Sequence, residues 1–248
     1  QRGAGASYSD SLTEDDMQVE KFVEDTKSLT NHLRARFKQD KIFMLGHSWG
    51  SALGFMTITK YSELYHAYIG AGEAADWSKR QAASFKWTLT QAKEKSIKEA
   101  IAELEATMPF DPANRNAVEA KNKWNARFGG TYYNRESYQK FRSYLGKGPE
   151  YNKADLQRFM KGHHWSQKTT AVLATKSGYS LFKTMPEIDI PVYFFAGRHD
   201  FQTPSSVTKE FYDVLKAPKK GFVWFENSAH GMLFNEKDKL SAELIKIS

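Results

Sequence analysis

The sequence predicts an α/β fold in which a mostly parallel sheet is flanked by helices and interrupted by an inserted helical cap. Short apolar segments typical of buried strands alternate with helical patterns near both ends of the chain. A long stretch between them has the pattern of amphipathic helices. The expected division is residues 1–71 for the first part of the core, 72–187 for the helical cap, and 188–248 for the second part of the core.

The first part of the core begins with a glycine-rich loop and a helix. Thr13 and Asp16 match a capping box, and the apolar residues after them recur near the helical period. The short apolar run KIFML lies between a charged turn and a glycine, which is typical of a buried strand. The elements expected here are a helix over 13–37, a strand over 41–45, a helix over 48–61 and a strand over 67–69.

The cap is rich in Lys, Glu and aromatic residues. Tyr138, Phe141 and Leu145 fall at helical spacing, which favours a lid helix over an aromatic groove for nucleic acid. Strand and helix patterns then alternate again, as parallel strands joined by helices require. The expected elements are a strand over 190–196, a helix over 204–216, a strand over 222–225 and a helix over 237–247.

Composition excludes several classes of protein. The chain of 248 residues is 40% hydrophobic and 26% charged, which is ordinary globular usage. It contains no cysteine, which excludes disulfides, thiolate metal sites and a cysteine nucleophile. The net charge is +7, but basic and acidic residues are mixed along the chain, so we expect no nucleic-acid partner. No apolar run approaches the length of a membrane span. We expect a cytoplasmic protein that needs no cofactor or metal.

Residues 46–50 read GHSWG and match the pattern G-x-S-x-G between a predicted strand and a predicted helix. This context is typical of a nucleophile elbow, in which a strained turn exposes the serine hydroxyl above the sheet. We expect Gly46 and Gly50 to let neighbouring chain segments approach closely there. Ser48 is therefore the candidate nucleophile. The backbone N–H of Trp49, at the start of the helix, is placed to donate to a developing oxyanion.

A serine nucleophile requires a base and an acid that orients the base. Asp200 follows the strand over 190–196, and His230 follows the strand over 222–225, so both are expected at the carboxyl edge of the sheet. Asp189 precedes its strand and belongs to the opposite edge. We therefore expect Asp200 as the acid and His230 as the base, with Glu226 as the next candidate acid.

Three other sets of titratable residues are candidates for roles in the site. His47 adjoins the serine and is expected to pack behind the elbow. His163 and His164 lack a correctly spaced third ligand for a metal. Glu73 follows the strand over 67–69, where it is placed either to bind a cationic substrate group or to be a plain surface carboxylate.

The segments QRGAGAS, GHSWGS, AGRHD and NSAHG together resemble the α/β-hydrolase superfamily, in particular prolyl-iminopeptidase-like members with a helical cap. The resemblance implies Ser48 as nucleophile, Asp200 as acid and His230 as base, and places Arg2 in a structural loop. It implies a serine hydrolase that cleaves a small ester or amide through an acyl-enzyme, with an aminopeptidase removing N-terminal proline as one form. The partner expected is a small molecule or short peptide.

Two departures from the family pattern leave alternatives open. Peptidase members usually have a second glycine where this chain has His47, which favours a more general carboxylesterase. An acyltransferase on the same triad, or a binding protein that has lost turnover, are further alternatives. Family members also carry strands and an oxyanion loop before QRGAGAS. We therefore expect residues 1–248 to be the later part of a longer polypeptide, in which an earlier strand pairs with the strand over 41–45.

Overall fold

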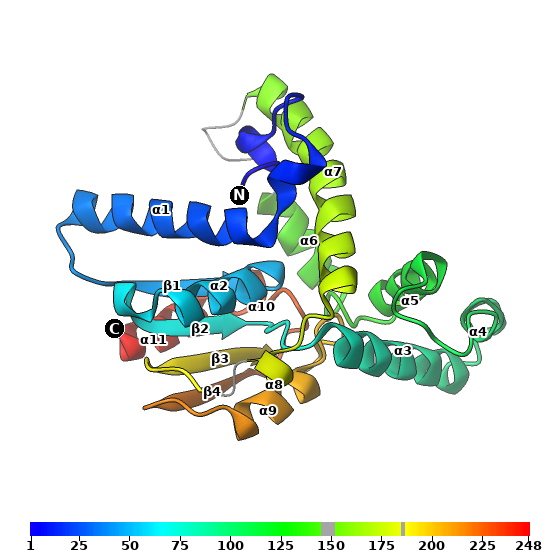
Figure 1. Ribbon diagram of the computed structural model, residues 1–248. Coiled ribbons are helices and arrows are strands. Elements are labelled where there is room, and N and C mark those ends of the chain that lie inside the picture. Colours follow the sequence, from blue (N-terminus) through cyan, green and yellow to red (C-terminus); the bar gives the residue numbers. More distant parts are fainter. Residues whose placement is uncertain (145–151, 185–186) are drawn as a thin grey trace.

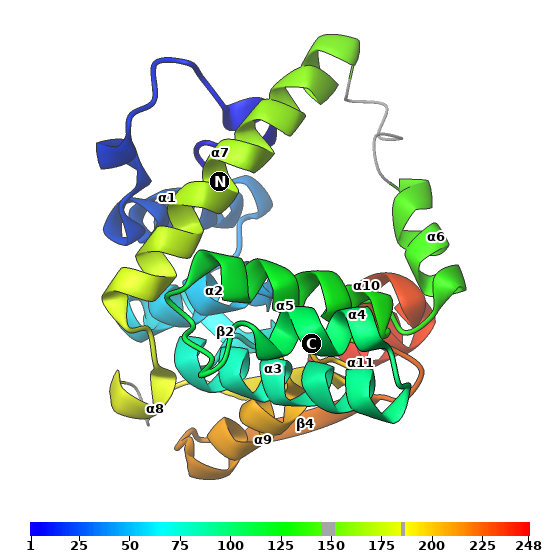
Figure 2. The same ribbon diagram turned by 90° about the vertical axis from the view of Figure 1, so that its right-hand side faces the viewer.

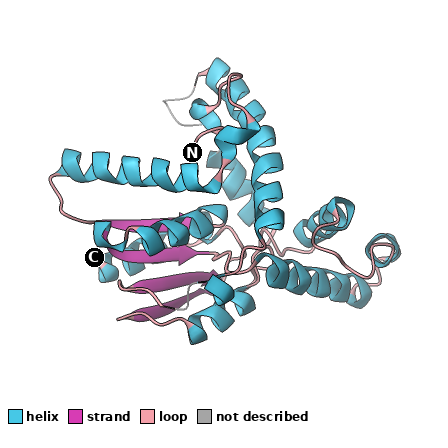
Figure 3. Cartoon of the chain, viewed as in Figure 1, coloured by secondary structure: helices cyan, strands magenta, loops and turns pink. Residues whose placement is uncertain are grey.

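The computed structural model describes residues 1–144, 152–184 and 187–248. For residues 6, 164 and 167–177 it describes the backbone only. Within the described residues the strands form one parallel sheet in the order β1-β2-β3-β4 (Figure 1). The helices lie around this single layer of strands (Figure 3). The strands are β1 (Ile42–His47), β2 (Tyr65–Ala71), β3 (Val192–Gly197) and β4 (Lys220–Phe225).

Successive side chains of a parallel strand point to opposite faces of the sheet. Apolar side chains therefore lie on both faces, and helices cover both of them. Tyr68 and Phe194 belong to the core on one face, which helices α2 and α9 complete. Ile69 and Phe195 belong to the core on the other face, against which α11 packs. The helices outside the cap are α1 (Val19–Phe37), α2 (Trp49–Lys60), α9 (Ser205–Val214), α10 (Met232–Asn235) and α11 (Lys237–Ile247).

A group of helices lies between β2 and β3 in the chain, within the expected cap (Figure 2). Helices α3, α4 and α5 pack around a small core of their own that contains Phe85, Leu104 and Trp124. Helix α7 packs instead against the N-terminal segment. The helices of this group are α3 (Trp77–Glu94), α4 (Lys98–Glu105), α5 (Arg115–Arg127), α6 (Arg135–Tyr144), α7 (Lys153–Ser177) and α8 (Leu181–Thr184).

The expected elements are present, with differences at their ends. The capping box of Thr13 and Asp16 is formed, but it starts a 3₁₀ turn, Glu14–Met17, and α1 begins only at Val19. Leu29 and Phe37, which belong to the apolar residues that recur along this helix, are exposed, so its apolar face is only partly buried. Leu145, expected in the lid helix, lies outside the described residues.

Strand β1 pairs with β2 alone among the described residues and therefore forms an edge of the sheet. Phe43 and Leu45, which the sequence predicts to be buried, are exposed on this strand. At the N-terminus Arg2 forms two hydrogen bonds of 2.6 Å with the carboxylate of Asp25, which fastens the first loop to α1. None of the described helices is long and apolar enough to cross a membrane.

Candidate active site

Ser48 lies in the turn between β1 and α2, where the motif predicts it. Its backbone has φ 57° and ψ −122°, a left-handed conformation that is costly for a residue with a side chain. The turn is held because Ser48 N–H donates to the Ala71 carbonyl of β2 at 3.1 Å, and the Ser51 hydroxyl donates to the Ser48 carbonyl at 2.6 Å. Strain of this kind is typical of functional sites.

Gly46 is required by close packing within the same turn. A Cβ added there would lie 2.4 Å from the carbonyl oxygen of Gly50, so any larger residue would push β1 away from α2. The expected close approach is confirmed at Gly46. At Gly50 an added Cβ would meet nothing within 4 Å, so the close approach expected at this second glycine is wrong.

Asp200 and His230 are brought together at the carboxyl edge of the sheet, as expected. His230 Nδ1 lies 2.8 Å from Asp200 Oδ2, and Asp200 is only 1% exposed. The other carboxylate oxygen, Oδ1, accepts from the backbone N–H groups of Gln202 and Thr203 at 2.9 and 2.8 Å. The imidazole is therefore held through Nδ1 by a fixed carboxylate, which leaves Nε2 available for proton transfer.

Two residues that the sequence does not indicate also contact this pair. The Thr203 hydroxyl lies 2.8 Å from Asp200 Oδ2 and 3.0 Å from His230 Nδ1, so it shares the bond between acid and base. Gly72, with φ 56°, follows β2, and a Cβ added to it would lie 3.1 Å from the His230 ring. Neither residue has a sequence signal of its own, because both act through long-range packing.

His47, which is expected to pack behind the elbow, contacts His230 directly. Its Nε2 lies 2.8 Å from the His230 carbonyl oxygen, and the two rings are 4.7 Å apart. Burial and the neighbouring His230 lower the pKa of His47 to about 4. A neutral imidazole donating from Nε2 to this carbonyl fixes the backbone of the candidate base.

Ser48 is linked to the Asp200–His230 pair through residues that adjoin it or bond to it. It follows His47, which contacts His230, and its own N–H is bonded to Ala71, the residue before Gly72. No hydrogen bond joins Ser48 to His230 in the described structure, and the Trp49 backbone N–H has no acceptor among the described residues. Catalytic hydrogen bonds are often loose in enzymes without substrate, and a free N–H is what an oxyanion requires.

Glu73 is 2% exposed and lies behind the elbow, away from open surface. Its Oε2 lies 2.6 Å from the Tyr68 hydroxyl, which also lies 2.8 Å from the backbone carbonyl of Ser51 in α2. This burial corrects the alternative of a plain surface carboxylate. A role in binding a substrate ammonium stays a prediction.

The contacts of Glu73 require a proton on its carboxyl group. The Tyr68 phenol has one hydrogen, but an ionised Glu73 and the Ser51 carbonyl would both need it. If Glu73 is protonated, it donates to Tyr68, and Tyr68 donates to Ser51, so each of these two contacts has its own hydrogen. In agreement, burial raises the pKa of Glu73 to about 7.

Glu73→Gln is expected to make the stability of the protein less dependent on pH. Because burial raises the pKa of the folded state from 4.5 to about 7, the folded protein retains a proton that the unfolded chain loses. The stabilisation is complete below pH 4.5 and is lost as the pH rises through 7, by roughly 3 kcal/mol in total. Melting temperatures measured between pH 4 and 8 should fall less in the variant than in the wild type.

Glu63→Gln, which changes an exposed carboxylate, is the control and should follow the wild-type curve. Parallel curves for Glu73→Gln and the wild type would contradict a buried proton. A raised KM for substrates with a free amino group, at unchanged pH dependence of stability, would instead support the role in binding ammonium.

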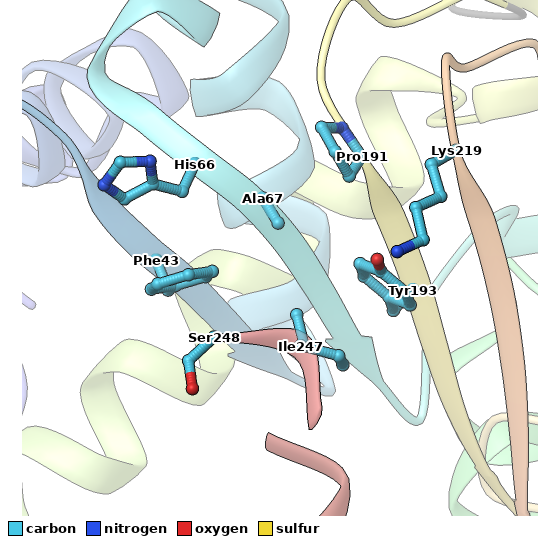
Figure 4. A pocket seen from close by; sticks show the side chains of 8 residues that line it. All are labelled: Phe43, His66, Ala67, Pro191, Tyr193, Lys219, Ile247 and Ser248. Carbon is cyan, nitrogen blue, oxygen red and sulfur yellow. The ribbon is translucent and has the colours of Figure 1, made fainter. Parts of the chain in front are cut away.

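Other groups lie away from this site. Glu226, the reserve candidate for the acid, is exposed and forms two hydrogen bonds with Arg198 instead. A surface pocket lined by Phe43, His66 and neighbouring residues lies at the amino ends of the strands, opposite Ser48 (Figure 4). Within the described residues no group of three His, Cys, Asp or Glu side chains is arranged to hold a metal.

The known proteins that this chain resembles are aminopeptidases and other hydrolases. A family model described as "Serine aminopeptidase, S33" matches residues 1–238. The chain is 28% identical over 232 residues to the "Probable aminopeptidase YbaC" of Bacillus subtilis (strain 168), covering 93% of this chain and 72% of that protein. It is 26% identical over 230 residues to the "Proline iminopeptidase" of Heyndrickxia coagulans, covering 91% and 71% respectively. An α/β fold family hydrolase from Bacillus anthracis str. Sterne has a similar structure, with a TM-score of 0.61, 19% identity, and coverage of 100% of this chain and 80% of the other.

Proposed function

Because the chain belongs to the serine aminopeptidase S33 family and has the α/β-hydrolase fold, we propose that this hydrolase uses Ser48 as its nucleophile. The observation that carries the proposal is the 2.8 Å contact between Asp200 and His230 beside a serine in a strained turn. We further propose that the enzyme removes an N-terminal residue from short peptides or amides. The names of the two relatives support this choice of substrate.

The proposed reaction follows from the roles of these groups. His230 Nε2 takes the hydroxyl proton of Ser48 as Oγ attacks the substrate carbonyl carbon, and the Trp49 N–H donates to the oxyanion. Asp200 holds the imidazole and stabilises its charged form. His230 then gives the proton to the leaving amine, and the acyl-enzyme forms as the C–N bond breaks. A water molecule, deprotonated by His230, attacks the ester, and the acid product leaves as Ser48 regains its proton.

The test combines labelling and substrate preference. A fluorophosphonate probe is expected to label the wild type and not Ser48→Ala. Alanyl and prolyl arylamides with a free amino group should be cleaved faster than their N-acetylated forms, because an aminopeptidase binds the ammonium. Equal rates for free and blocked substrates would overturn the aminopeptidase assignment and leave an esterase. Failure to label Ser48 would overturn the nucleophile.

A further inference from the structure

Buried polar atoms that lack a hydrogen-bond partner gather in one part of the described structure. Such atoms are uncommon in folded proteins, and each requires an explanation, such as a bound molecule or water. Apart from Asn235, the residues concerned come from three short segments, at the start of α3, in α5 and just before α8. The atoms are Glu73 Oε1, Trp77 Nε1, Gln81 Oε1, Lys121 Nζ, Asn122 Oδ1, the Tyr179 hydroxyl and Ser180 Oγ.

Contacts between the segments place the first and third of them side by side. Trp77 N–H donates to the Tyr179 carbonyl at 3.0 Å, and Asp76 forms a backbone bridge with Ser180. The Arg80 guanidinium lies over the Trp77 ring, 4.6 Å from its centroid. The first turn of α3 and the residues before α8 therefore form one polar region.

Lys121 comes to the same region from α5. It is 0% exposed, and its Nζ has no partner among the described residues. It lies one turn before Asn125, whose Nδ2 is 3.2 Å from Ser84 Oγ of α3 and 2.9 Å from the Phe201 carbonyl. The face of α5 that carries Lys121 thus meets α3 and the loop that follows Asp200.

Two cationic groups in this region have no counter-ion. Neither Arg80 nor Lys121 forms a salt bridge in the described structure. Burial, reinforced by the neighbouring Arg80, lowers the pKa of Lys121 to about 7. Burial also lowers the pKa of Arg80 to about 10, although Asp200 acts in the opposite direction. Lys121 is the buried cation without a partner; such a group is costly, and a bound anion would remove that cost.

Asp76 and Asp200 already have other partners, and Glu73, whose Oε1 is unpartnered, carries a proton in its contact with Tyr68. Asp76 Oδ1 accepts from the Lys79 N–H at 2.7 Å as the cap of α3, and Asp200 is bonded to Thr203 and His230. The remaining donors are an ammonium, a guanidinium, the indole N–H of Trp77 and the Tyr179 hydroxyl. Donors of this number and charge suit the two oxygens of a carboxylate.

We propose that Arg80 and Lys121 form a subsite for a carboxylate group of the substrate, beside the Asp200–His230 pair. The inference rests on the proposed function and adds a substrate class to it: short peptides with a free carboxyl terminus, or esters of diacids. The contact of Asn125, one turn after Lys121, with the carbonyl of Phe201 places the subsite near the loop of the candidate acid. Its two cations would select such substrates over their uncharged analogues.

The test compares acidic and neutral substrates of the same shape. Alanyl-alanine is paired with alanyl-alaninamide, and 4-nitrophenyl hemisuccinate with 4-nitrophenyl butyrate, so that a carboxylate is offered on either side of the cleaved bond. In Lys121→Met and Arg80→Met we expect KM to rise about 10- to 100-fold for the acidic member of at least one pair. The KM of the acidic member relative to that of its neutral partner should rise by this factor, and Arg80→Lys should recover part of the loss.

Lys86→Met, which changes an exposed cation of α3, is the control and should behave as the wild type. An equal change for acidic and neutral substrates would show that these residues support the fold only, and would overturn the subsite. So would an unchanged ratio of the two KM values in both pairs. Hydrolysis of the neutral esters and labelling of Ser48 report on the proposed function separately.

A binding measurement tests the subsite even if the protein proves inactive. Succinate is expected to raise the melting temperature of Ser48→Ala, whereas succinamide is not. The shift should disappear when Lys121→Met is added to Ser48→Ala. The same shift with and without Lys121 would place the bound carboxylate elsewhere, and the absence of a shift would overturn the proposal.

Discussion

Ser48→Ala is expected to remove almost all hydrolysis, with a loss of kcat of about a millionfold, and His230→Ala is expected to do the same. The reason is that the hydroxyl and its base act as one unit, so that neither accelerates the reaction without the other. The double variant should therefore be hardly slower than either single variant. The measurement is kcat on a neutral aryl ester, with the melting temperature as a check of folding.

His32→Ala, which changes an exposed histidine of α1, is the matched control and should keep full activity. Losses that multiply in the double variant would mean that Ser48 and His230 act independently. In that case the nucleophile and the base would have been assigned to the wrong residues.

Asp200→Asn is expected to reduce kcat by about ten-thousandfold, the loss found for the same change in a well-studied serine protease. Asp200 accepts four hydrogen bonds, from Gln202 N–H, from the Thr203 N–H and hydroxyl, and from His230 Nδ1. An amide cannot accept all four. With its NH₂ group toward His230 it forces the proton onto Nε2, which then cannot take the proton of Ser48.

Thr203→Val measures the contribution of the Thr203 hydroxyl separately from that of the Asp200 carboxylate. This variant removes one hydrogen bond to Asp200 Oδ2 and leaves the bond to His230 in place. We expect a loss of kcat of about tenfold, which corresponds to one hydrogen bond. Near-normal activity of Asp200→Asn would move the acid elsewhere, and equal losses in the two variants would assign the orienting role to Thr203.

The positions of the residues in this candidate site are largely predictable, because each residue lies in a turn at the end of a strand that the sequence indicates. The motif around Ser48 combines a strand, a tight turn and a helix within a few residues, and local steric rules determine such a turn. Asp200 and His230 were predicted to meet because each follows a parallel strand, and the carboxyl ends of parallel strands lie at one edge of the sheet. Their contact at 2.8 Å agrees with that expectation.

By itself, the sequence determined the alternation of strands and helices and the positions of the candidate nucleophile, acid and base at the carboxyl ends of the strands. Only the tertiary structure decided that Glu73 is buried against Tyr68 and that Lys121 is buried without a counter-ion. The physical reason is that periodicity and motifs describe neighbours along one element. The burial of a charged group depends instead on which other elements pack over it, and that is set by contacts between segments far apart in the chain.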